Sequence, residues 1–264
     1  MTDLKFDHLR WQVEGSVATI WLSRAPVNAV NQAMYKEIQY IFSHIDRLGH
    51  DLRCVVLAGD GPHFCAGNEL EEFETLSPDN ARERMFNGRE AFWAVRDCPI
   101  PVVAAVHGAA LGTGVALVSC CDIVIAADDA RLGLPEIKVG VMGGPKLLSR
   151  LMPPGVVRWM FFSGEPQPAS EFHRLGSVAK LVPEASLLQE AQAVARQVAR
   201  HSPVALTLGK RALNQTEYLP LKAGYEVEQG LTARLSAHPH AKEALRAFRE
   251  KRAPNYLPDP PNSN

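Results

Sequence analysis

The sequence predicts an α/β protein with a layered core. Several short apolar runs lack the alternation of half-exposed strands, which is typical of strands buried on both faces of a sheet. Segments with helical spacing separate these runs up to about residue 165, and this strand–helix–strand order is typical of α/β domains. About the last hundred residues are mostly amphipathic helix. We therefore expect an α/β core followed by a helical C-terminal region.

The elements are expected at definite places along the chain. Segments rich in β-branched and apolar residues are expected as strands: residues 16–23, 52–61, 100–108, 123–126 and 131–133. Apolar residues at helical spacing predict the helices: residues 32–48, 81–98, 183–202, 203–216 and 238–256. The proline-rich end, residues 257–264, is expected to fray.

Composition excludes several classes of protein. The chain has 264 residues and a formal net charge of −1, so it offers no basic field for nucleic acid. Its apolar runs are too short and glycine-rich to span a bilayer, and its first residues lack the apolar segment of a leader peptide. Five cysteines without a Cys-x-x-Cys pair indicate reduced thiols and no metal site. We expect a soluble cytoplasmic protein with no nucleic-acid or membrane partner.

Two glycine-containing loops follow buried strands. They are residues 61–73 (GPHFCAGNELEEF) and residues 107–122 (HGAALGTGVALVSCCD). Backbone N–H groups at such strand ends could converge into an oxyanion hole, or the glycines could simply close tight turns. Neither loop matches a nucleotide-binding fingerprint or a nucleophile elbow. The order and spacing of His107, Ser119 and Asp122 give little support to a catalytic triad.

Glu136 is the third candidate feature. It follows a proline in the otherwise apolar segment of residues 132–144 (LGLPEIKVGVMGG). Desolvation would raise the pKa of a lone carboxyl there, which suits a general acid or base. Alternatively, Glu136 could cap the nearby helix start or pair with Lys138.

Together these stretches resemble the crotonase (enoyl-CoA hydratase/isomerase) superfamily. The resemblance runs from Trp11 to Tyr256 and is carried by HFCAGNELEEF, AAVHGAALGTGVALVSCCDIVIAADDARLGLPEIKVGV and EALRAFREKRAPNY. It implies a crotonase-like spiral of repeated ββα units with a C-terminal helical trimerisation region. We accordingly expect a core over residues 1–200 and a helical region over residues 201–264 that packs on the core or on a neighbouring subunit. The oligomer would be a homotrimer or a hexamer formed as a dimer of trimers.

The resemblance also implies a site for an acyl-CoA thioester, with no cofactor beyond the coenzyme A of the substrate. The backbone N–H groups of Asn68 and Thr113 would hold the thioester oxygen and stabilise an enolate. The other implied substrate and CoA positions are Ala66, Gly67, Leu70, Gly112, Phe248 and Lys251. Of these, Ala66 and Leu70 fall where the family holds adenine and pantetheine. The last two lie on the C-terminal helix, which often touches CoA from the adjacent subunit.

The chain departs from the family pattern in three places. Glu136 matches one of the two glutamates of the hydratases, but the other position is Ala116. Glu71 stands where the adenine loop often has a basic residue. The segment of residues 137–148 is about three residues shorter than the common pattern, so the floor of the pocket is expected to differ.

A single glutamate limits the possible reaction. Isomerisation of a double bond needs one base, whereas hydration without the second acid would lose roughly 10²–10⁴ in rate. Hydratase-lyases acting on hydroxycinnamoyl-CoA also use one glutamate, helped by a polar group from another segment. The candidates for such a helper are Glu83, Arg89, Glu90 and Tyr225.

Three functions are therefore carried forward. The first is an enoyl-CoA hydratase/isomerase-type enzyme, a lyase or isomerase of fatty acid metabolism, with Glu136 as its acid/base. The second is another crotonase reaction, such as hydratase-lyase chemistry, C–C bond hydrolysis or thioester hydrolysis. The third is a CoA-thioester binding protein with little turnover, which the cost of burying an unused Glu136 disfavours.

Overall fold

The computed structural model describes residues 4–256, and it confirms the predicted α/β class. The strands are β1 (Leu9–Glu14), β2 (Val17–Leu22), β3 (Cys54–Gly59), β4 (Val102–Val106), β5 (Ala109–Leu111), β6 (Ile123–Ala127), β7 (Arg131–Gly133), β8 (Gln167–Pro168) and β9 (Lys180–Val182). The helices are α1 (Gln32–Ser43), α2 (Leu70–Glu74), α3 (Pro78–Arg96), α4 (Thr113–Cys120), α5 (Pro145–Leu148), α6 (Pro154–Ser163), α7 (Ala169–Arg174), α8 (Glu184–Val198), α9 (Pro203–Thr216), α10 (Leu221–Ser236) and α11 (Pro239–Glu250). Two 3₁₀ segments, η1 (Ile45–Leu48) and η2 (Pro135–Val139), complete them.

The strands form two sheets. The larger has the order β1-β2-β3-β4-β6-β9, and the smaller has the order β5-β7-β8. β1 and β2 are antiparallel, and every later neighbour in the larger sheet is parallel. The strand–strand–helix order recurs as β1-β2-α1, β4-β5-α4 and β6-β7-η2. This repetition is the ββα spiral that the resemblance implies.

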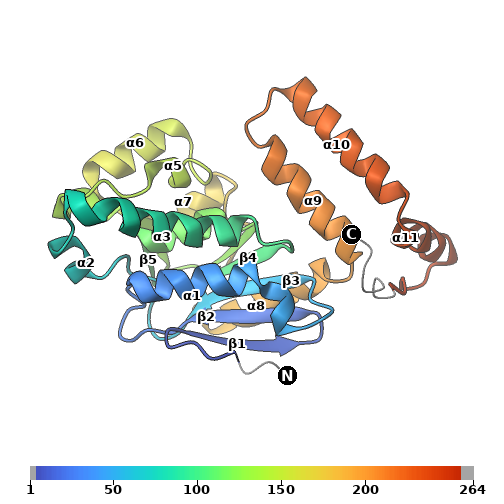
Figure 1. The fold of residues 1–264 in the computed structure, drawn as a ribbon, viewed down its shortest axis with the longest axis horizontal. Helices are drawn as coiled ribbons and strands as arrows, with labels where there is room; N and C mark the ends of the chain where they lie inside the picture. The colour runs from blue at the N-terminus through green and yellow to red at the C-terminus, as the bar shows by residue number, and fades with distance from the viewer. Residues whose placement is uncertain (1–3, 257–264) are drawn as a thin grey trace.

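Helices cover both faces of the larger sheet, which explains its non-alternating apolar strands. α1 buries Met34, Ile38 and Phe42, and α3 runs beside it (Figure 1). α8 packs on β3, β4 and β6. As a result β3 and β4 are buried almost throughout. The carboxyl ends of these parallel neighbours point the same way, and the loops that follow them are thus brought together.

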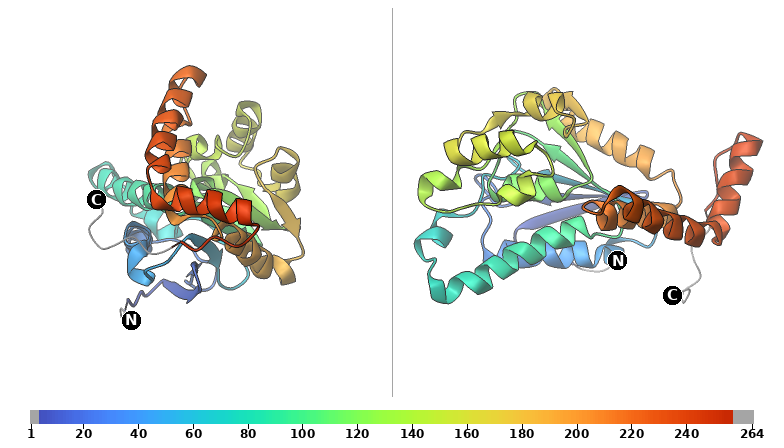
Figure 2. Two further views of the ribbon diagram at one scale, coloured as in Figure 1. Left: turned by 90° about the vertical axis from the view of Figure 1, so that its right-hand side faces the viewer. Right: turned by 90° about the horizontal axis from the view of Figure 1, so that it is seen from above.

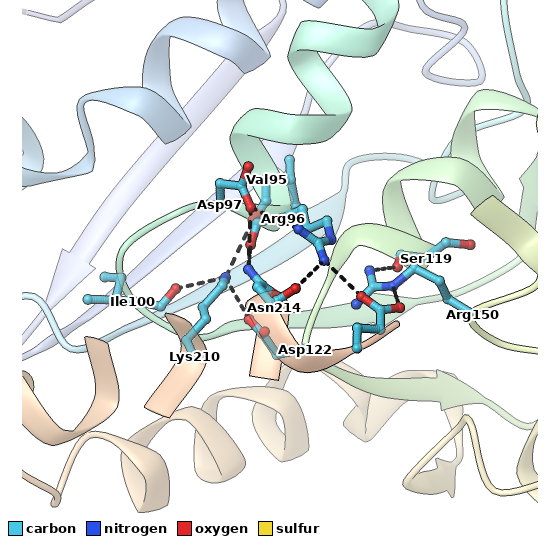
Figure 3. Close-up of polar contacts among 10 residues, drawn as sticks. Val95, Arg96, Asp97, Ile100, Ser119, Asp122, Arg150, Lys210 and Asn214 are labelled. Carbon is cyan, nitrogen blue, oxygen red and sulfur yellow. Dashed lines mark hydrogen bonds and ion pairs between the residues drawn. The ribbon is translucent and has the colours of Figure 1, made fainter. Parts of the chain in front are cut away.

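The C-terminal helices extend from this core. Figures 1 and 2 show α9 and α10 as an antiparallel pair that projects beyond the sheet, with α11 past its end. α9 is tied to the core by Lys210, whose Nζ donates to the carbonyl of Ile100 at 3.2 Å and pairs with Asp122 at 2.8 Å (Figure 3). Glu217, just after α9, pairs with Arg96 at 2.8 Å and Arg150 at 2.7 Å. The division after residue 200 and trimerisation stay predictions.

Several elements differ from the sequence-based expectations. The helix expected over residues 32–48 ends at Ser43, and a 3₁₀ turn follows that still buries Ile45 and Leu48. β1, α6 and α10 were not expected as separate elements. The predicted fraying of residues 257–264 lies outside the described residues. Among helices of residues 4–256, none combines the length and apolarity that crossing a bilayer requires.

The five cysteines, all within the described part of the chain, are free and buried. Burial raises the pKa of the Cys65 thiol to about 12. Thiols in such surroundings are unreactive small hydrophobic groups. No group of three or more metal-binding side chains forms among residues 4–256.

Candidate active site

The two glycine-containing loops meet beside the smaller sheet. The N–H of Cys65 donates to the carbonyl of Ala109 at 3.0 Å, and the N–H of Leu111 donates to the carbonyl of Cys65 at 2.9 Å. This β-bridge brings Asn68 next to Thr113, and the Thr113 hydroxyl oxygen lies 2.9 Å from the Asn68 side-chain oxygen. A side-chain contact thus joins two residues that lie 45 positions apart in the sequence.

The backbone N–H groups of Asn68 and Thr113 are available to a ligand. The N–H of Val30 donates to the carbonyl of Gly67 at 2.8 Å, and the N–H of Glu69 donates to the carbonyl of Val30 at 3.0 Å. The bridge between Val30 and Asn68 thus uses the two residues that flank Asn68 and does not use the Asn68 N–H. Thr113 opens α4, where N–H groups have no acceptor within the helix. Both donors therefore resemble those that bind anionic oxygen at loop and helix starts.

A pocket of about 410 Å³ opens beside these donors. Its wall is largely apolar and comes from α2, α3 and the segment after η2, with Phe73, Leu76, Met85, Phe92, Trp93, Met142 and Leu147. Asn68, Thr113 and Glu136 belong to the same lining. Ala116 also lines the pocket. At this position, where the hydratases have their second glutamate, the chain therefore presents only a methyl group to the pocket. An apolar pocket with few convergent polar groups is the usual form of a small-molecule site.

Glu136 is held between two glycines. A Cβ placed on Gly112 would lie 2.7 Å from Glu136 Oε1, and one on Gly143 would lie 2.7 Å from the carboxyl carbon. Only the absence of side chains at these positions, both with positive φ, lets the carboxyl fit. The Glu136 carboxyl is thereby fixed next to Gly112, the residue immediately before Thr113.

The Glu136 carboxyl is poorly satisfied. Its Oε2 is buried and has no hydrogen-bond partner among the described residues. Burial raises the pKa of Glu136, and a hydrogen bond to its own backbone lowers it by less. The alternative of a pair with Lys138 is not found, because Lys138 binds Glu165 at 2.7 Å. η2 has no side-chain cap either.

Tyr35 is a pocket residue that the sequence analysis missed. Its hydroxyl lies 2.5 Å from Asn68 Oδ1 and 2.7 Å from Thr113 Oγ1. Tyr35 sits on the core-facing stripe of α1 beside Met34 and Ile38, so its spacing indicates packing alone. The available signal was its phenol, since a buried tyrosine hydroxyl usually finds a polar partner.

Other predicted positions lie apart from the pocket. Leu70 is 65% exposed at the start of α2, and Phe248 is 82% exposed on α11. Lys251 caps the C-terminal end of α11, the helix that Figure 1 shows past the end of the α9–α10 pair. Within this chain they do not join Glu136. The described residues that line the pocket also leave out Ala66 and Gly67, which lie in the bridged loop just before Asn68.

Most of the predicted helper residues, and the three residues of the weakly supported triad, also lie outside the described lining of the pocket. Arg89 lines the pocket, whereas Glu83, Glu90 and Tyr225 are absent from its described lining. Ser119 donates to the carbonyl of Val115, His107 contacts the carbonyl of Gly61, and Asp122 pairs with Lys210. These three side chains have separate partners, so they form no triad.

Comparison with known proteins identifies relatives over nearly the whole chain. The family model described as enoyl-CoA hydratase/isomerase matches residues 12–258. The short-chain-enoyl-CoA hydratase of Clostridium acetobutylicum is 30% identical over 254 residues, which cover 94% of this chain and 97% of the relative. A (7aS)-7a-methyl-1,5-dioxo-2,3,5,6,7,7a-hexahydro-1H-indene-carboxyl-CoA hydrolase of Mycobacterium tuberculosis is 32% identical over 239 residues, covering 90% and 96%. The solved enoyl-CoA hydratase from Bacillus anthracis has a TM-score of 0.89 at 30% identity, covering 95% of this chain and 99% of that one.

Proposed function

The chain belongs to the enoyl-CoA hydratase/isomerase family and is an acyl-CoA-processing enzyme; from that premise we propose single-glutamate chemistry on an enoyl- or hydroxyacyl-CoA thioester. The backbone N–H groups of Asn68 and Thr113 would hold the thioester oxygen, and Glu136 would transfer the proton. The observation that carries this proposal is the Glu136 carboxyl fixed beside Gly112, one residue from the Thr113 donor. Asn68, Gly112, Thr113 and Glu136 all lie in the wall of one pocket.

The chemistry requires negative charge on the thioester oxygen. When the Glu136 carboxylate takes a proton from the carbon next to the thioester, the electron pair of the C–H bond moves onto that oxygen. Two preorganised N–H donors stabilise the resulting enolate. Returning the same proton to another carbon moves the double bond and restores Glu136. This sequence needs one base, which fits a pocket whose second acid position is Ala116.

The raised pKa of Glu136 suits this role. A carboxyl whose pKa lies closer to the working pH is both a stronger base when ionised and a usable acid when protonated. The unpartnered Oε2 adds to this, because no other side chain competes for the proton. The alternative of another crotonase reaction, such as C–C bond hydrolysis, is favoured by the relative that is named a hydrolase.

The assembly and surroundings are also proposals. We propose a homotrimer or a dimer of trimers, supported by large apolar side chains exposed on α10 and α11: Leu221, Tyr225, Leu245 and Phe248. Phe248 and Lys251 would then reach the CoA of an adjacent subunit. We propose no cofactor beyond the substrate's CoA. A cytoplasmic location would suit the five free thiols.

The test is a panel of enoyl-CoA and 3-hydroxyacyl-CoA thioesters. Turnover would be followed by ultraviolet loss of the conjugated thioester and by mass spectrometry, for wild type, Glu136→Gln and Glu165→Gln. Glu165 is a matched control, because it is an exposed glutamate whose partner, Lys138, lies two residues after Glu136. We expect one substrate class to react, Glu136→Gln to lose most of the rate, and Glu165→Gln to keep it. Equal activity of wild type and Glu136→Gln would refute the assignment.

A further inference from the structure

We propose that Tyr35 is a positioning residue that braces the two donors of the oxyanion hole through their side chains. The inference rests on the proposed function, because it presumes that the N–H groups of Asn68 and Thr113 hold the thioester oxygen. A single phenol oxygen contacts both residues, at 2.5 Å and 2.7 Å. Tyr35 lies on α1, so the brace joins a third segment of the fold to the two donor loops.

The ring of Tyr35 is fixed on its other sides. It packs edge-on against Phe92 of α3, with ring centroids 5.9 Å apart. The backbone of α3 comes close at Gly88, where an added Cβ would lie 3.4 Å from the ring. The residue is only 5% exposed. α1 and α3 thus hold the phenol in one place, which is what a brace requires.

The hydrogen atoms of the cluster indicate the direction of its bonds. Three oxygens lie within 2.9 Å of one another, but only the hydroxyls of Tyr35 and Thr113 carry hydrogen. The two shortest contacts both involve Tyr35. When the Thr113 hydroxyl donates to Tyr35 and the Tyr35 hydroxyl donates to Asn68, both hydrogens lie in the two shortest contacts, and the three residues form a chain of hydrogen bonds. Such chains strengthen each member. Burial raises the pKa of Tyr35 well above its usual value, so the phenol keeps its proton at neutral and moderately alkaline pH.

The two donors need such a brace because they come from different segments. Asn68 belongs to the loop after β3, and Thr113 belongs to the first turn of α4. Their N–H groups must aim at one oxygen, and a misplacement of about 1 Å can cost roughly 10² in rate. Removing the phenol oxygen leaves both N–H groups present but less tightly aimed. We therefore expect a loss smaller than the roughly 10²–10³ for deleting one donor.

The experiment compares Tyr35→Phe with Tyr40→Phe. Tyr40 is a matched control on the same helix, where its hydroxyl accepts a bond from Arg47 at 2.6 Å. We expect Tyr35→Phe to lower kcat about 10-fold, which is below the roughly 10²–10³ for deleting one donor. KM should change little, since the proposed CoA positions Leu70, Phe248 and Lys251 lie outside the pocket lined by Tyr35. Tyr40→Phe should match wild type.

The specific readout is the infrared carbonyl stretch of a bound thioester labelled with ¹³C at its carbonyl. In wild type we expect a shift to lower frequency on binding, and in Tyr35→Phe a clearly smaller shift. Unchanged shift and kcat in Tyr35→Phe would overturn the brace while leaving the proposed function standing. No shift in wild type would overturn the oxyanion assignment itself, and the brace with it.

A second variant separates bracing from an independent effect of Tyr35. Thr113→Val removes one end of the chain of hydrogen bonds while keeping the backbone N–H. If Tyr35 acts through this chain, the losses from Tyr35→Phe and Thr113→Val will be less than additive in the double variant. Additive losses would overturn the brace.

Discussion

The close contact between Glu136 and Gly143, one of the two glycines that enclose its carboxyl, gives the sharpest prediction. Gly140 and Gly143 lie in the same loop, and both have positive φ, +77° and +65°. Alanine at either position pays a similar backbone cost, about 1–2 kcal/mol for a left-handed residue. Of these two glycines, Gly143 alone lies against the Glu136 carboxyl, because a Cβ on Gly140 would meet nothing within 4 Å. The pair therefore separates the loop's stability from the placement of Glu136.

The structure fixes the size of the disturbance. A Cβ on Gly143 would lie 2.7 Å from both the carboxyl carbon and Oε1 of Glu136. Ordinary contact between such atoms begins at about 3.5 Å, so the carboxyl or the loop must move by roughly 0.8 Å. Because a misplacement of about 1 Å can cost roughly 10² in rate, we expect Gly143→Ala to lower kcat/KM by about 30- to 100-fold.

The assay is kcat/KM on the best substrate of the thioester panel, with thermal unfolding of each variant measured alongside. We expect Gly140→Ala to keep kcat/KM within about twofold of wild type while its Tm falls by the backbone cost alone. The Tm of Gly143→Ala should fall at least as far, because the clash with Glu136 adds to the same backbone cost. Equal activity of the two alanine variants would refute the argument that Glu136 is held by the glycine backbone.

Three further predictions concern other residues. Because burial raises the pKa of Glu136 in the folded state, stability should fall as pH rises from the unfolded value of about 4.3 through the folded pKa. Glu136→Gln lacks this loss, so its Tm relative to wild type should be higher at pH 7 than at pH 4; a pH-independent difference would contradict this. Ala116→Glu should supply the second acid and raise the rate of enoyl-CoA hydration about 10- to 100-fold. An unchanged hydration rate would contradict the role of Glu136 as the partner base. Lys210→Met removes a buried ammonium that pairs with Asp122 and donates to the carbonyl of Ile100, and should lower the free energy of unfolding by about 1–3 kcal/mol in urea titration; a loss below about 1 kcal/mol would show that the pair is dispensable.

Local patterns were enough to predict much of the fold. The apolar runs of β3 and β4 and the glycines after them are recognisable one segment at a time, and so is Glu136 in its apolar surroundings. α10 was missed because only Gly224 of this helix is buried, so no apolar stripe marks a core-facing side. β1 was missed because alternate positions are the polar residues Arg10, Gln12 and Glu14, so this edge strand lacks the apolar run of the buried strands.

The polar cluster could not be predicted in this way. Tyr35 meets Asn68 across 33 positions and Thr113 across 78 positions. Its neighbours on α1 indicate a core-facing stripe, and only the fold brings the phenol to the two loops. The same holds for the two glycines around Glu136, since Gly112 and Gly143 come from different sides of that residue in the chain. Contacts between distant segments depend on topology, which periodicity does not contain.

The most direct test of single-glutamate enolate chemistry is hydrogen exchange at the carbon next to the thioester. A saturated acyl-CoA would be incubated with the enzyme in D₂O and its mass followed over time, so that no particular overall reaction has to be assumed. Wild type should incorporate deuterium far faster than buffer, and Glu136→Gln should be slower by roughly 10²–10⁴. The account would be contradicted if wild type binds the acyl-CoA but exchanges deuterium no faster than buffer alone. Equal exchange rates for wild type and Glu136→Gln would contradict it as well.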